Sequence, residues 1–510
     1  MSNVMVINMG LKSIRCMLFN ESGLKLASAS ESINTQINDE RVEQDPAEWW
    51  EKAENVIRRA IMDASLHSVD YITVTASASC LVCVDKEGVA LGRAIMISDK
   101  RAAAESRYLS KLPEAVTLQQ ETGLDMNASL MLPKIVWFNK NNPAEAAQTY
   151  KYLTPNDFII YKLCGQFVTD RLNALKYHYN HKTKCYPNDL LCKIGIPEDR
   201  LPAVAEPGTE AGQILDTMAE KLQISKGAKI VLSSYDAICS FVGSGATEDG
   251  EASDVSGTVT VFRTVSKTGI KKQNSNIYTL PFPDGDTTLV GGSNNLGGGL
   301  IEWVKQCYYQ KESCPYELME MDARESEVGA RGLIFLPYLL GERAPVWDDD
   351  ARGVFFGLER MHTRKDMTRA VFESTGYIDL DMICEIENTG IPVHTVRLSG
   401  GLARVQLISQ IKADIIGKDV LVLEEFETTA AGAAMQVLIG VGHFRSAREA
   451  AEKFVAIRMI VCPNRSNHEK YRYMYELYKE TYKSLKGLFI RRKEILSQMG
   501  SAREIKIENL

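Results

Sequence analysis

The chain has 510 residues, too many for a single hydrophobic core, so two or more domains are expected. Its composition, 45% hydrophobic and 25% charged, is ordinary for a globular protein, and the net charge of −7 argues against a nucleic-acid partner. No apolar run reaches the roughly 20 residues that a membrane-spanning helix needs. The first ten residues lack the basic segment and cleavage site of a signal peptide, so we expect a cytoplasmic protein with no membrane partner.

The cysteines and histidines suggest two clusters that could bind a metal. Cys80 and Cys83 form a CxxC motif inside an apolar, strand-like stretch, and no second pair accompanies it. A buried structural role is favoured there over a redox or metal role. His178 and His181 lie near Cys185, but a full set of zinc ligands is not visible, which disfavours a zinc site.

The chain opens with a predicted β-meander whose strands cover 4–8, 13–19 and 24–30. The first turn, from Asn8 to Ser13, is small enough to bring backbone N–H groups and Lys12 to a phosphate. A plain hairpin turn is the simpler alternative.

A helix is predicted over 46–64, with Asp45 as the N-cap, Pro46 first and Glu48 completing a capping box. Its apolar face is predicted from Trp50, Ala53, Val56, Ile57 and Ala60.

Further along the first half, two strands are predicted within 71–84, around a bend at 76–79. The charged residues 98–101 follow another short strand, so they either line a cleft or begin a solvated helix. A strand and helix follow over 152–163, then a strand entering a loop over 167–173. Residues 182–212 are rich in proline, glycine and charge and are expected to form a surface excursion.

Asp236 is the acid on which the first half centres. It follows a short apolar run at 230–232 that predicts a buried strand, and a helix of small residues is predicted over 237–242. Ligands of open α/β sheets bind at the carboxyl ends of the strands, so Asp236 is placed to accept the proton of a substrate hydroxyl. The alternative is that Asp236 only caps the following helix.

The second half begins as the first does, after a small acidic run at 246–251. Strands at 252–255 and 259–265 flank a tight turn from Ser256 to Thr258, which suggests internal duplication. A glycine-rich loop is predicted over 289–300, feeding a helix that contains Trp303. A strand at 396–398 ends in paired glycines, which either admit a ligand to the backbone or only make a turn.

The remaining elements of the second half are a strand at 333–340, a long helix at 363–383 and an Ala/Gly-rich helix at 429–440 able to pack very close to a neighbour. The chain is predicted helical beyond Asn467, with Tyr471, Tyr475 and Tyr478 on one face, as core rather than ligand site. The charged residues from 501 are expected to fray.

Several of these segments, in this order, resemble the FGGY carbohydrate kinases of the actin-like superfamily over about residues 4–478. The matching motifs are Glu43-Gln44-Asp45-Pro46 with Trp49-Trp50, residues 152–157 (YLTPND), Val168-Thr169-Asp170 with Asn173-Ala174, residues 335–345 (FLPYLLGERAP), Ala351-Arg352-Gly353 with Gly357-Leu358, and Ser399-Gly400-Gly401 with Gln410 and Ala413-Asp414.

The resemblance implies an α/β fold of two actin-like (ribonuclease H-like) domains with a nucleotide cleft between them that closes on its ligands. It implies domains at 1–247, with the sugar site, and 248–485, with the adenosine site, followed by a helical and frayed tail at 486–510. Transfer of the γ-phosphate of ATP, with Mg²⁺, to a hydroxyl of a small sugar, sugar acid or polyol is the implied reaction. A homodimer is expected.

The resemblance also assigns roles to individual residues. Asp236 falls at the position of the catalytic base. The nucleotide-binding positions are Gly10, Lys12, Ser13, Arg15, Gly257, Thr258, Gly298, Gly400, Gly401 and Val405. The sugar-binding positions are Ala78, Ser79, Asp99 and Arg101, with Asp236, and the Mg²⁺ positions are Asn8 and Asp236.

Three departures from the family pattern limit what the resemblance implies. The first phosphate loop has Asn8 and Leu11 where the family usually has aspartate and threonine, and Mg²⁺ prefers charged oxygen ligands. The second loop continues with Val259-Thr260 instead of Ser-Gly. Among the sugar contacts, the Met-His pair typical of xylulose kinases is Ala78-Ser79, and the aromatic that glycerol kinases place after Thr-Gly-Leu is absent near Ser129, so neither xylulose nor glycerol is assigned.

Two functional hypotheses remain after these departures. The first is an active kinase, favoured by Asp236 and the intact glycine pair. The alternative, favoured by Asn8 and Leu11, is a catalytically impaired homologue that binds a ligand or regulates a partner. A filament or chaperone ATPase is disfavoured by the sugar-kinase motifs outside the nucleotide loops.

Overall fold

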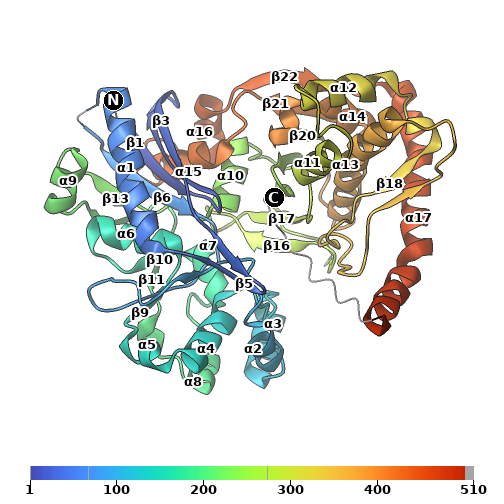
Figure 1. The fold of residues 1–510 in the computed structure, drawn as a ribbon. Coiled ribbons are helices and arrows are strands. Elements are labelled where there is room, and N and C mark those ends of the chain that lie inside the picture. The colour runs from blue at the N-terminus through green and yellow to red at the C-terminus, as the bar shows by residue number, and fades with distance from the viewer. Residues whose placement is uncertain (1, 67, 273, 500–510) are drawn as a thin grey trace. The chain divides into compact units, whose positions relative to one another are not determined.

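The computed structural model describes residues 2–66, 68–272 and 274–499, and the chain folds into two compact units. Among the described residues, the first unit runs to Gly243 and also takes in 429–454, whereas the second holds 244–428 and 455–499 (Figure 1). Each unit is built on a mixed α/β sheet, which confirms the predicted fold class. The chain thus leaves the first unit, forms most of the second, returns, and leaves again.

The sheet of the first unit contains six strands within the described residues, in the order β12-β13-β6-β1-β2-β3. Their bounds are Glu210–Gln213, Lys229–Val231, Tyr71–Ala76, Asn3–Met9, Ser13–Asn20 and Lys25–Ser32. β1 is buried along its whole length, as expected of a central strand covered on both faces. It pairs antiparallel with β2, which pairs antiparallel with β3, so the predicted meander is confirmed. On its other side, β1 pairs parallel with β6.

Helix α1 (Pro46–Ala64) packs against strands β2 and β3; Figure 1 labels α1 and β3. Asp45 Oδ1 accepts the N–H of Ala47 at 2.9 Å, which confirms the predicted N-cap. The predicted capping box is wrong, because Glu48 Oε1 accepts instead from the backbone and side-chain nitrogens of Asn34. Trp49, rather than Trp50, is the fully buried tryptophan of this helix.

The other helices of the first unit pack around this sheet and around small sheets beside it. The helices are α2 (Ala103–Leu109), α3 (Pro113–Thr122), α4 (Met131–Asn141), α5 (Pro143–Gln148), α6 (Pro155–Cys164), α7 (Arg171–Ala174), α8 (Asn188–Ile194), α9 (Asp216–Leu222), α10 (Asp236–Ser244), α15 (Thr428–Gly440) and α16 (Ala447–Phe454). The small sheets are β4 (Gln36–Asn38) with β5 (Arg41–Gln44) and β8 (Ala94–Ile95), β7 (Val82–Val84) with β9 (Lys151–Leu153), and β10 (Val168–Asp170) with β11 (Ala203–Ala205).

Residues 182–212 are not the simple surface excursion that their composition suggests. They contain α8 and β11 and most of β12, which is an edge strand of the six-stranded sheet. Leu190 and Leu191 of α8 are 1% exposed and join a hydrophobic cluster with Leu109 and Tyr177. Charge and proline mark the loops here, while the few leucines anchor the segment.

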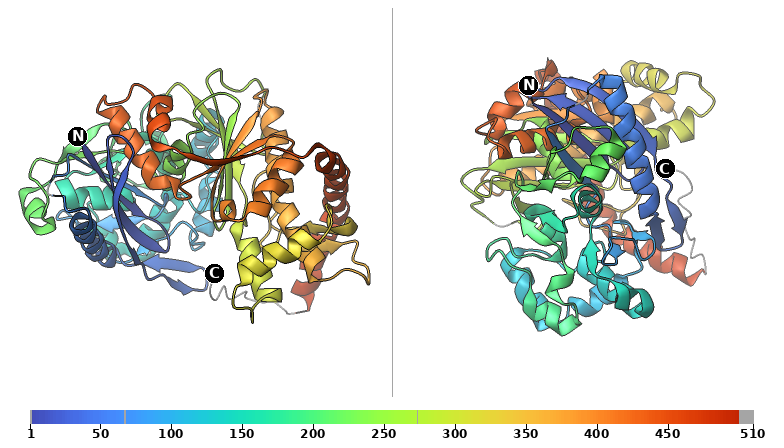
Figure 2. Two further views of the ribbon diagram at one scale, coloured as in Figure 1. Left: turned by 90° about the horizontal axis from the view of Figure 1, so that it is seen from above. Right: turned by 90° about the vertical axis from the view of Figure 1, so that its left-hand side faces the viewer.

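The Ala/Gly-rich helix α15 belongs to the first unit and packs against α10. A Cβ placed on Gly432 would lie 1.8 Å from the carbonyl oxygen of Cys239, and one on Gly440 would meet the backbone of Gly208. The close packing predicted for this helix is therefore confirmed. Figures 1 and 2 show α15 and α16, in orange, beside the blue strands at the start of the chain.

The sheet of the second unit contains seven strands within its described part, in the order β16-β17-β15-β14-β20-β21-β22. Their bounds are Tyr278–Pro281, Thr288–Ser293, Thr260–Ser266, Glu251–Ser256, Thr395–Gly400, Asp419–Leu423 and Ile457–Val461. The predicted strand–turn–strand opening is confirmed as β14 and β15. The predicted glycine-rich loop is partly wrong, since 288–293 form strand β17. Gly291 fits there because a Cβ would lie 2.2 Å from the carbonyl oxygen of Phe262 on β15.

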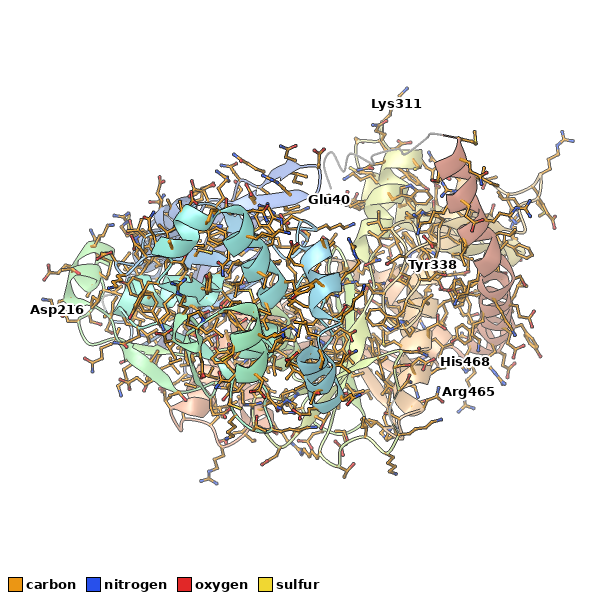
Figure 3. The ribbon with its side chains drawn as sticks, turned by 90° about the horizontal axis from the view of Figure 1, so that it is seen from below. Glu40, Asp216, Lys311, Tyr338, Arg465 and His468 are labelled. Atoms are coloured by element: carbon orange, nitrogen blue, oxygen red, sulfur yellow. The ribbon has the colours of Figure 1, made fainter. Side chains whose placement is uncertain are left out.

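The helices of the second unit are α11 (Gly298–Tyr308), α12 (Pro315–Glu325), α13 (Arg364–Glu387), α14 (Gln406–Ile416) and α17 (Arg465–Gln498), beside the hairpin of β18 (Ile334–Leu336) and β19 (Val354–Phe356). Tyr471, Tyr475 and Tyr478 of α17 are buried in the core, as predicted, and the hydroxyls of Tyr478 and Tyr338 are 2.7 Å apart. Figure 3 labels Tyr338, and it also labels Arg465 and His468, which lie in the first turn of α17. The frayed tail expected from residue 501 lies outside the described residues.

Within the described residues, helices of the length and apolarity required to cross a bilayer are absent. Cys80 and Cys83 are both buried and unbridged, in keeping with the structural role favoured for them.

Candidate functional site

Three segments of the first unit meet at one edge of its sheet. Strands β1, β6 and β13 are parallel, with β6 in the middle, so their carboxyl ends lie side by side. The turn at Gly10 follows β1, residues Ala78 and Ser79 follow β6, and Asp236 follows β13. Ser77 N also donates to the carbonyl of Met9 at 3.0 Å, which joins the first two segments directly. This edge is where an open α/β sheet binds ligands.

The turn between β1 and β2 is closed by its own backbone. Gly10 N donates to Ser13 O at 2.9 Å, and Asn8 stands opposite Arg15 in the ladder. Lys12 and Leu11 are exposed, whereas Asn8 is only 9% exposed. The turn therefore presents Lys12 outward, as its predicted contact with a phosphate requires.

A glutamine from the first family motif holds this turn from outside. Gln44 Nε2 donates to the carbonyl of Leu11 at 2.8 Å, and Trp49 Nε1 donates to Gln44 Oε1 at 2.8 Å. Gln44 is 1% exposed, so the two contacts fix its amide. The contact of this motif with the turn was not predictable from the sequence, because 33 residues separate Gln44 from Leu11.

Asp236 is the first residue of α10, one position earlier than the predicted start. Its Oδ1 accepts the N–H of Ala237 at 2.7 Å, and the residue remains partly exposed. A carboxylate in the first turn of a helix interacts favourably with the helix dipole. Contact with the helix and reaction with a substrate are therefore compatible roles.

The loop that carries Asp236 is fixed by a buried acid from another motif. Ser234 Oγ donates to Asp170 Oδ1 at 2.9 Å, and the same oxygen accepts the N–H groups of Leu172 and Asn173. Asp170 is 2% exposed, and burial raises its pKa to about 7. The motif at 168–173 thus spans β10 and the start of α7, and its Asp170 holds the loop that precedes Asp236.

Asp99 and Arg101, two predicted sugar contacts, bind each other. Arg101 Nε and Nη2 donate to the two oxygens of Asp99 at 2.8 and 2.7 Å, and Arg101 Nη2 also lies 2.7 Å from Glu43 Oε1. The Arg101 guanidinium stacks on Trp137, 4.9 Å from the ring centre. Asp99 is 2% exposed, so this pair is a fixed, buried element rather than the start of a solvated helix; α2 begins only at Ala103.

The predicted nucleotide residues of the second unit gather at the carboxyl edge of its sheet. Parallel strands β14 and β20 end at Ser256 and Gly400, which are paired in register. Gly298 N donates to Gly257 O at 2.7 Å, and Gly297 N donates to Thr258 O at 2.8 Å.

A glycine is required at one of these positions. Gly400 has φ +85°, and a Cβ on it would lie 2.4 Å from Ser256 O. Gly401 and Val405 follow as the short turn that leads into α14.

Three buried charged residues lie next to the turn at Gly257 and Thr258, which follows β14. Ser256 Oγ donates to Asp254 Oδ1 at 2.6 Å, and Lys412 Nζ donates to Asp254 Oδ2 at 2.6 Å and to Asp379 Oδ2 at 2.5 Å. Burial, together with the neighbouring Asp254, raises the pKa of Asp379. These residues join β14, α13 and α14. The only signal of these residues in the sequence is a charged residue at positions that are otherwise apolar.

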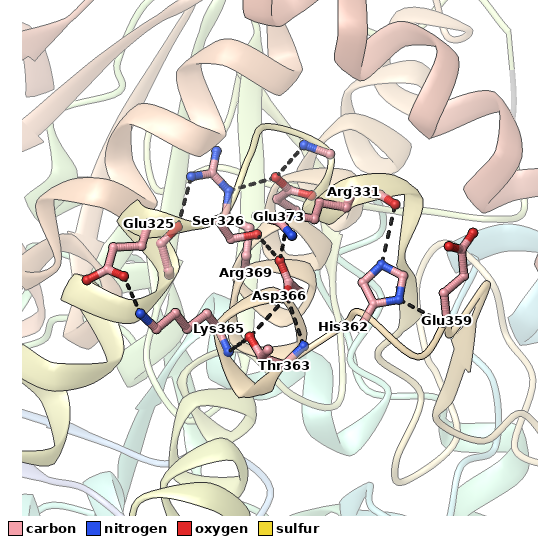
Figure 4. A network of polar contacts seen from close by, with 12 residues as sticks. Glu325, Ser326, Arg331, Glu359, His362, Thr363, Lys365, Asp366, Arg369 and Glu373 are labelled. Atoms are coloured by element: carbon pink, nitrogen blue, oxygen red, sulfur yellow. Dashed lines mark hydrogen bonds and ion pairs between the residues drawn. The ribbon is translucent and has the colours of Figure 1, made fainter.

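A separate polar network surrounds the start of α13 (Figure 4). Asp366 accepts from Ser326 Oγ at 2.8 Å and from Thr363 N at 2.9 Å, which completes a capping box. A pocket of about 300 Å³ opens here, lined by Glu325, Ser326, Arg331, Thr363, Arg364, Lys365 and Asp366. None of the predicted site residues lines it. Arg364 pairs with Asp322 at 2.8 Å, and Arg331 with Asp366 at 3.5 Å, so these cations serve the fold.

Comparison with known proteins shows which family the two halves of the chain match. A model of the N-terminal domain of the FGGY family of carbohydrate kinases matches residues 3–243, and a model of the C-terminal domain matches residues 252–440. The chain belongs to the FGGY family of carbohydrate kinases. Kinases of this family use ATP, so the ligands of the family are a nucleotide and a carbohydrate.

Individual FGGY relatives carry different substrate names. A xylulose kinase of Staphylococcus epidermidis is 27% identical over 489 residues, which cover 95% of this chain and 97% of that protein. A gluconokinase of Bacillus subtilis is 25% identical over 457 residues, covering 87% and 89%. A crystal structure of gluconate kinase from Lactobacillus acidophilus superposes with a TM-score of 0.88 at 25% identity, covering 96% of this chain and 99% of that one.

Proposed function

We propose that this FGGY kinase transfers the γ-phosphate of ATP to a hydroxyl of a small sugar, sugar acid or polyol. The observation that carries the proposal is the meeting of the Gly10 turn, the Ala78–Ser79 bend and Asp236 at the carboxyl edge of one sheet. A phosphate-sized turn, a small-residue bend and a partly exposed acid are the parts that phosphoryl transfer to a hydroxyl needs.

In this proposal Asp236 is the general base. It lies in the first turn of α10, where its Oδ1 accepts the N–H of Ala237, and its carboxylate accepts the proton of the substrate hydroxyl. Proton removal makes the hydroxyl oxygen a nucleophile toward the γ-phosphorus, whose bond to the leaving ADP oxygen breaks. Lys12 offers a positive charge to the phosphates, and Ser13 and Arg15 complete the first turn.

The turn at Gly257 and Thr258 holds further phosphate oxygens, and Gly298, Gly400, Gly401 and Val405 are assigned to the nucleoside side. Glycine at these positions lets an anion or a flat ring approach the backbone closely, because no side chain intervenes. On the sugar side, Ala78 and Ser79 leave room for a substrate, and the Asp99–Arg101 pair borders it. We also propose a homodimer in the cytoplasm.

A magnesium ion has two candidate protein ligands in this chain, Asn8 and Asp236. Asn8 offers a neutral amide oxygen and is largely buried in β1, while Asp236 offers a charged and partly exposed carboxylate. This donor set fits an Mg²⁺ that ATP phosphates and water hold for the most part. Bound Mg²⁺ would neutralise charge on the β- and γ-phosphate oxygens.

The second candidate function is that of a catalytically impaired homologue that binds a ligand. It is favoured by Leu11, whose side chain is 43% exposed at the position where the family usually places a threonine hydroxyl. In that case sugar binding persists while turnover is very slow.

The test is ADP release by the purified protein with MgATP and a panel of pentuloses, hexuloses, aldonates and polyols. The relatives named for xylulose and gluconate make a ketopentose and an aldonate the first members of the panel. Sugar-dependent ADP release identifies a kinase. Binding of a panel member by calorimetry without ADP release supports the impaired homologue instead, and neither turnover nor binding overturns both. Sedimentation of the same sample tests the homodimer, which a monomer would contradict.

A further inference from the structure

Lys134 is a buried lysine that joins two segments predicted to contact the sugar. It lies on α4, is 0% exposed, and donates from Nζ to the carbonyl oxygens of Ser79 at 2.5 Å and Met96 at 2.9 Å. Ser79 belongs to the bend after β6, and Met96 lies just before the Asp99–Arg101 pair. The two carbonyls come from residues 55 and 38 positions away in the chain, so the lysine bridges segments that the backbone does not connect.

The burial of this ammonium group is costly unless its contacts repay it. Burial lowers the pKa of Lys134 to about 8, while the nearby Cys80 and Asp99 oppose that change and Arg101 adds to it. An apolar side chain would fill the same space without that cost. The lysine therefore does something that packing alone does not require.

The bend that Lys134 contacts has a strained backbone. Ser79 has φ +61°, in the left-handed region that side chains other than glycine rarely adopt. A residue keeps such a conformation only where its surroundings stabilise it. Here Lys134 Nζ donates a hydrogen bond to the carbonyl of Ser79 itself. The charged donor thus stabilises the conformation that aims the side chains of Ala78 and Ser79.

A second residue of α4 supports the other predicted sugar segment. Trp137 lies three positions after Lys134, on the same face of the helix, and its ring carries the Arg101 guanidinium at 4.9 Å. One face of α4 therefore contacts both the Ser79 bend and the Asp99–Arg101 pair.

We propose that Lys134 is a positioning residue for the carbohydrate substrate, holding the Ser79 bend and the Met96 carbonyl at the spacing that the bound sugar requires. The proposal rests on the carbohydrate-kinase function proposed above, because it assigns those two segments to the sugar. Lys134 acts through the segments it holds and does not touch the reacting atoms.

The experiment compares Lys134→Met with a matched control, Lys151→Met. Lys151 also donates to two carbonyls in the first unit, those of Asp199 and Leu201, but neither belongs to a predicted sugar segment. Both variants remove an amine that donates to two backbone carbonyls, which for Lys151 belong to one segment and for Lys134 to two. Steady-state kinetics use the best panel sugar, ATP binding is measured by calorimetry without sugar, and sugar binding is measured by calorimetry as well.

We expect Lys134→Met to raise the KM for the sugar at least tenfold, while Lys151→Met changes it less than twofold and ATP affinity stays within twofold in both. Lys134→Gln, which keeps a shorter donor, should give an intermediate KM. Adding Ser79→Gly to Lys134→Met should recover part of the loss, because glycine adopts φ +61° without support; a role in folding alone would not produce that coupling.

Two outcomes overturn the proposal: an unchanged sugar KM in folded Lys134→Met, or an equal rise in both lysine variants. If Lys134→Met does not fold, an unchanged KM in Lys134→Gln has the same meaning. Failure of the proposed function appears differently, as a wild-type protein that turns over none of the panel. The variants are then compared by the calorimetric affinity for whichever panel sugar the wild type binds, and a wild type that binds none overturns this proposal too.

Discussion

Asp236 is the side chain whose loss should affect the proposed reaction most. We predict that Asp236→Ala lowers kcat by at least about 10²-fold, the usual contribution of a general base, while ATP still binds. Asp216→Ala is the matched control, because Asp216 is likewise the first residue of a helix, α9, and is exposed (Figure 3). Equal turnover of Asp236→Ala and the parent would remove Asp236 from the chemistry.

The first phosphate turn offers a test of its two unusual residues. Asn8→Asp combined with Leu11→Thr should tighten MgATP binding by about tenfold, or roughly 1.4 kcal/mol, because a carboxylate and a hydroxyl replace an amide and an apolar group. Leu24→Thr, at another exposed leucine, which follows the next turn, should leave affinity unchanged. Calorimetry that finds no gain in the double variant would show that Lys12 or another group already serves the phosphates.

Asp170 predicts how stability depends on pH. Its pKa is raised from 3.8 to about 7 by burial, so between these values the folded protein keeps a proton that the unfolded chain has released. The free energy of unfolding of the wild type, relative to Asp170→Asn, should therefore be greatest below about pH 4 and fall by roughly 2–4 kcal/mol as the pH rises to 7. Urea titrations of both proteins at each pH measure the difference, and a flat difference would contradict the raised pKa.

At the scale of elements, two helical glycines should respond in opposite directions to the same substitution. Gly432→Ala places a methyl group 1.8 Å from the carbonyl of Cys239, so the α10–α15 contact must open, at about 1–3 kcal/mol or more. Gly487→Ala on α17 meets nothing within 4 Å and should stabilise its helix by about 0.5–1 kcal/mol. Thermal unfolding should show a lower Tm for the first and an equal or higher Tm for the second; a neutral Gly432→Ala would mean that the helices separate easily.

Helix and strand ends were predicted well where neighbouring residues in the sequence determine them. The Asp45-Pro46 start fixed the beginning of α1, and the apolar run before Asp236 fixed the end of β13 to within a residue or two. What the sequence did not reveal was which distant partner each polar side chain meets. Gln44 with Leu11 and Lys134 with Ser79 are such pairs, since burial of a polar residue is visible in sequence only as an exception to a pattern.

At the scale of the whole molecule, the first unit is not continuous in sequence. We predict that a fragment of residues 1–247 fails to fold to a native core, because it lacks α15 and α16, whose Gln436 and Phe454 contact Cys239 and Phe19. Residues 1–243 joined by a short linker to 429–454 should be monodisperse and unfold cooperatively. Cooperative unfolding of the shorter fragment by circular dichroism would show that the returning helices are dispensable.

The return of residues 429–454 to the first unit also governs how the protein is made on the ribosome. The sheet of that unit emerges early, but the surface of α10 and Gly208 stays uncovered until the whole segment 244–428 has been synthesised. At roughly 5–20 residues per second that interval lasts on the order of 10–40 seconds. A nascent chain therefore spends that time with this packing surface uncovered, and early termination anywhere before residue 454 leaves neither unit complete.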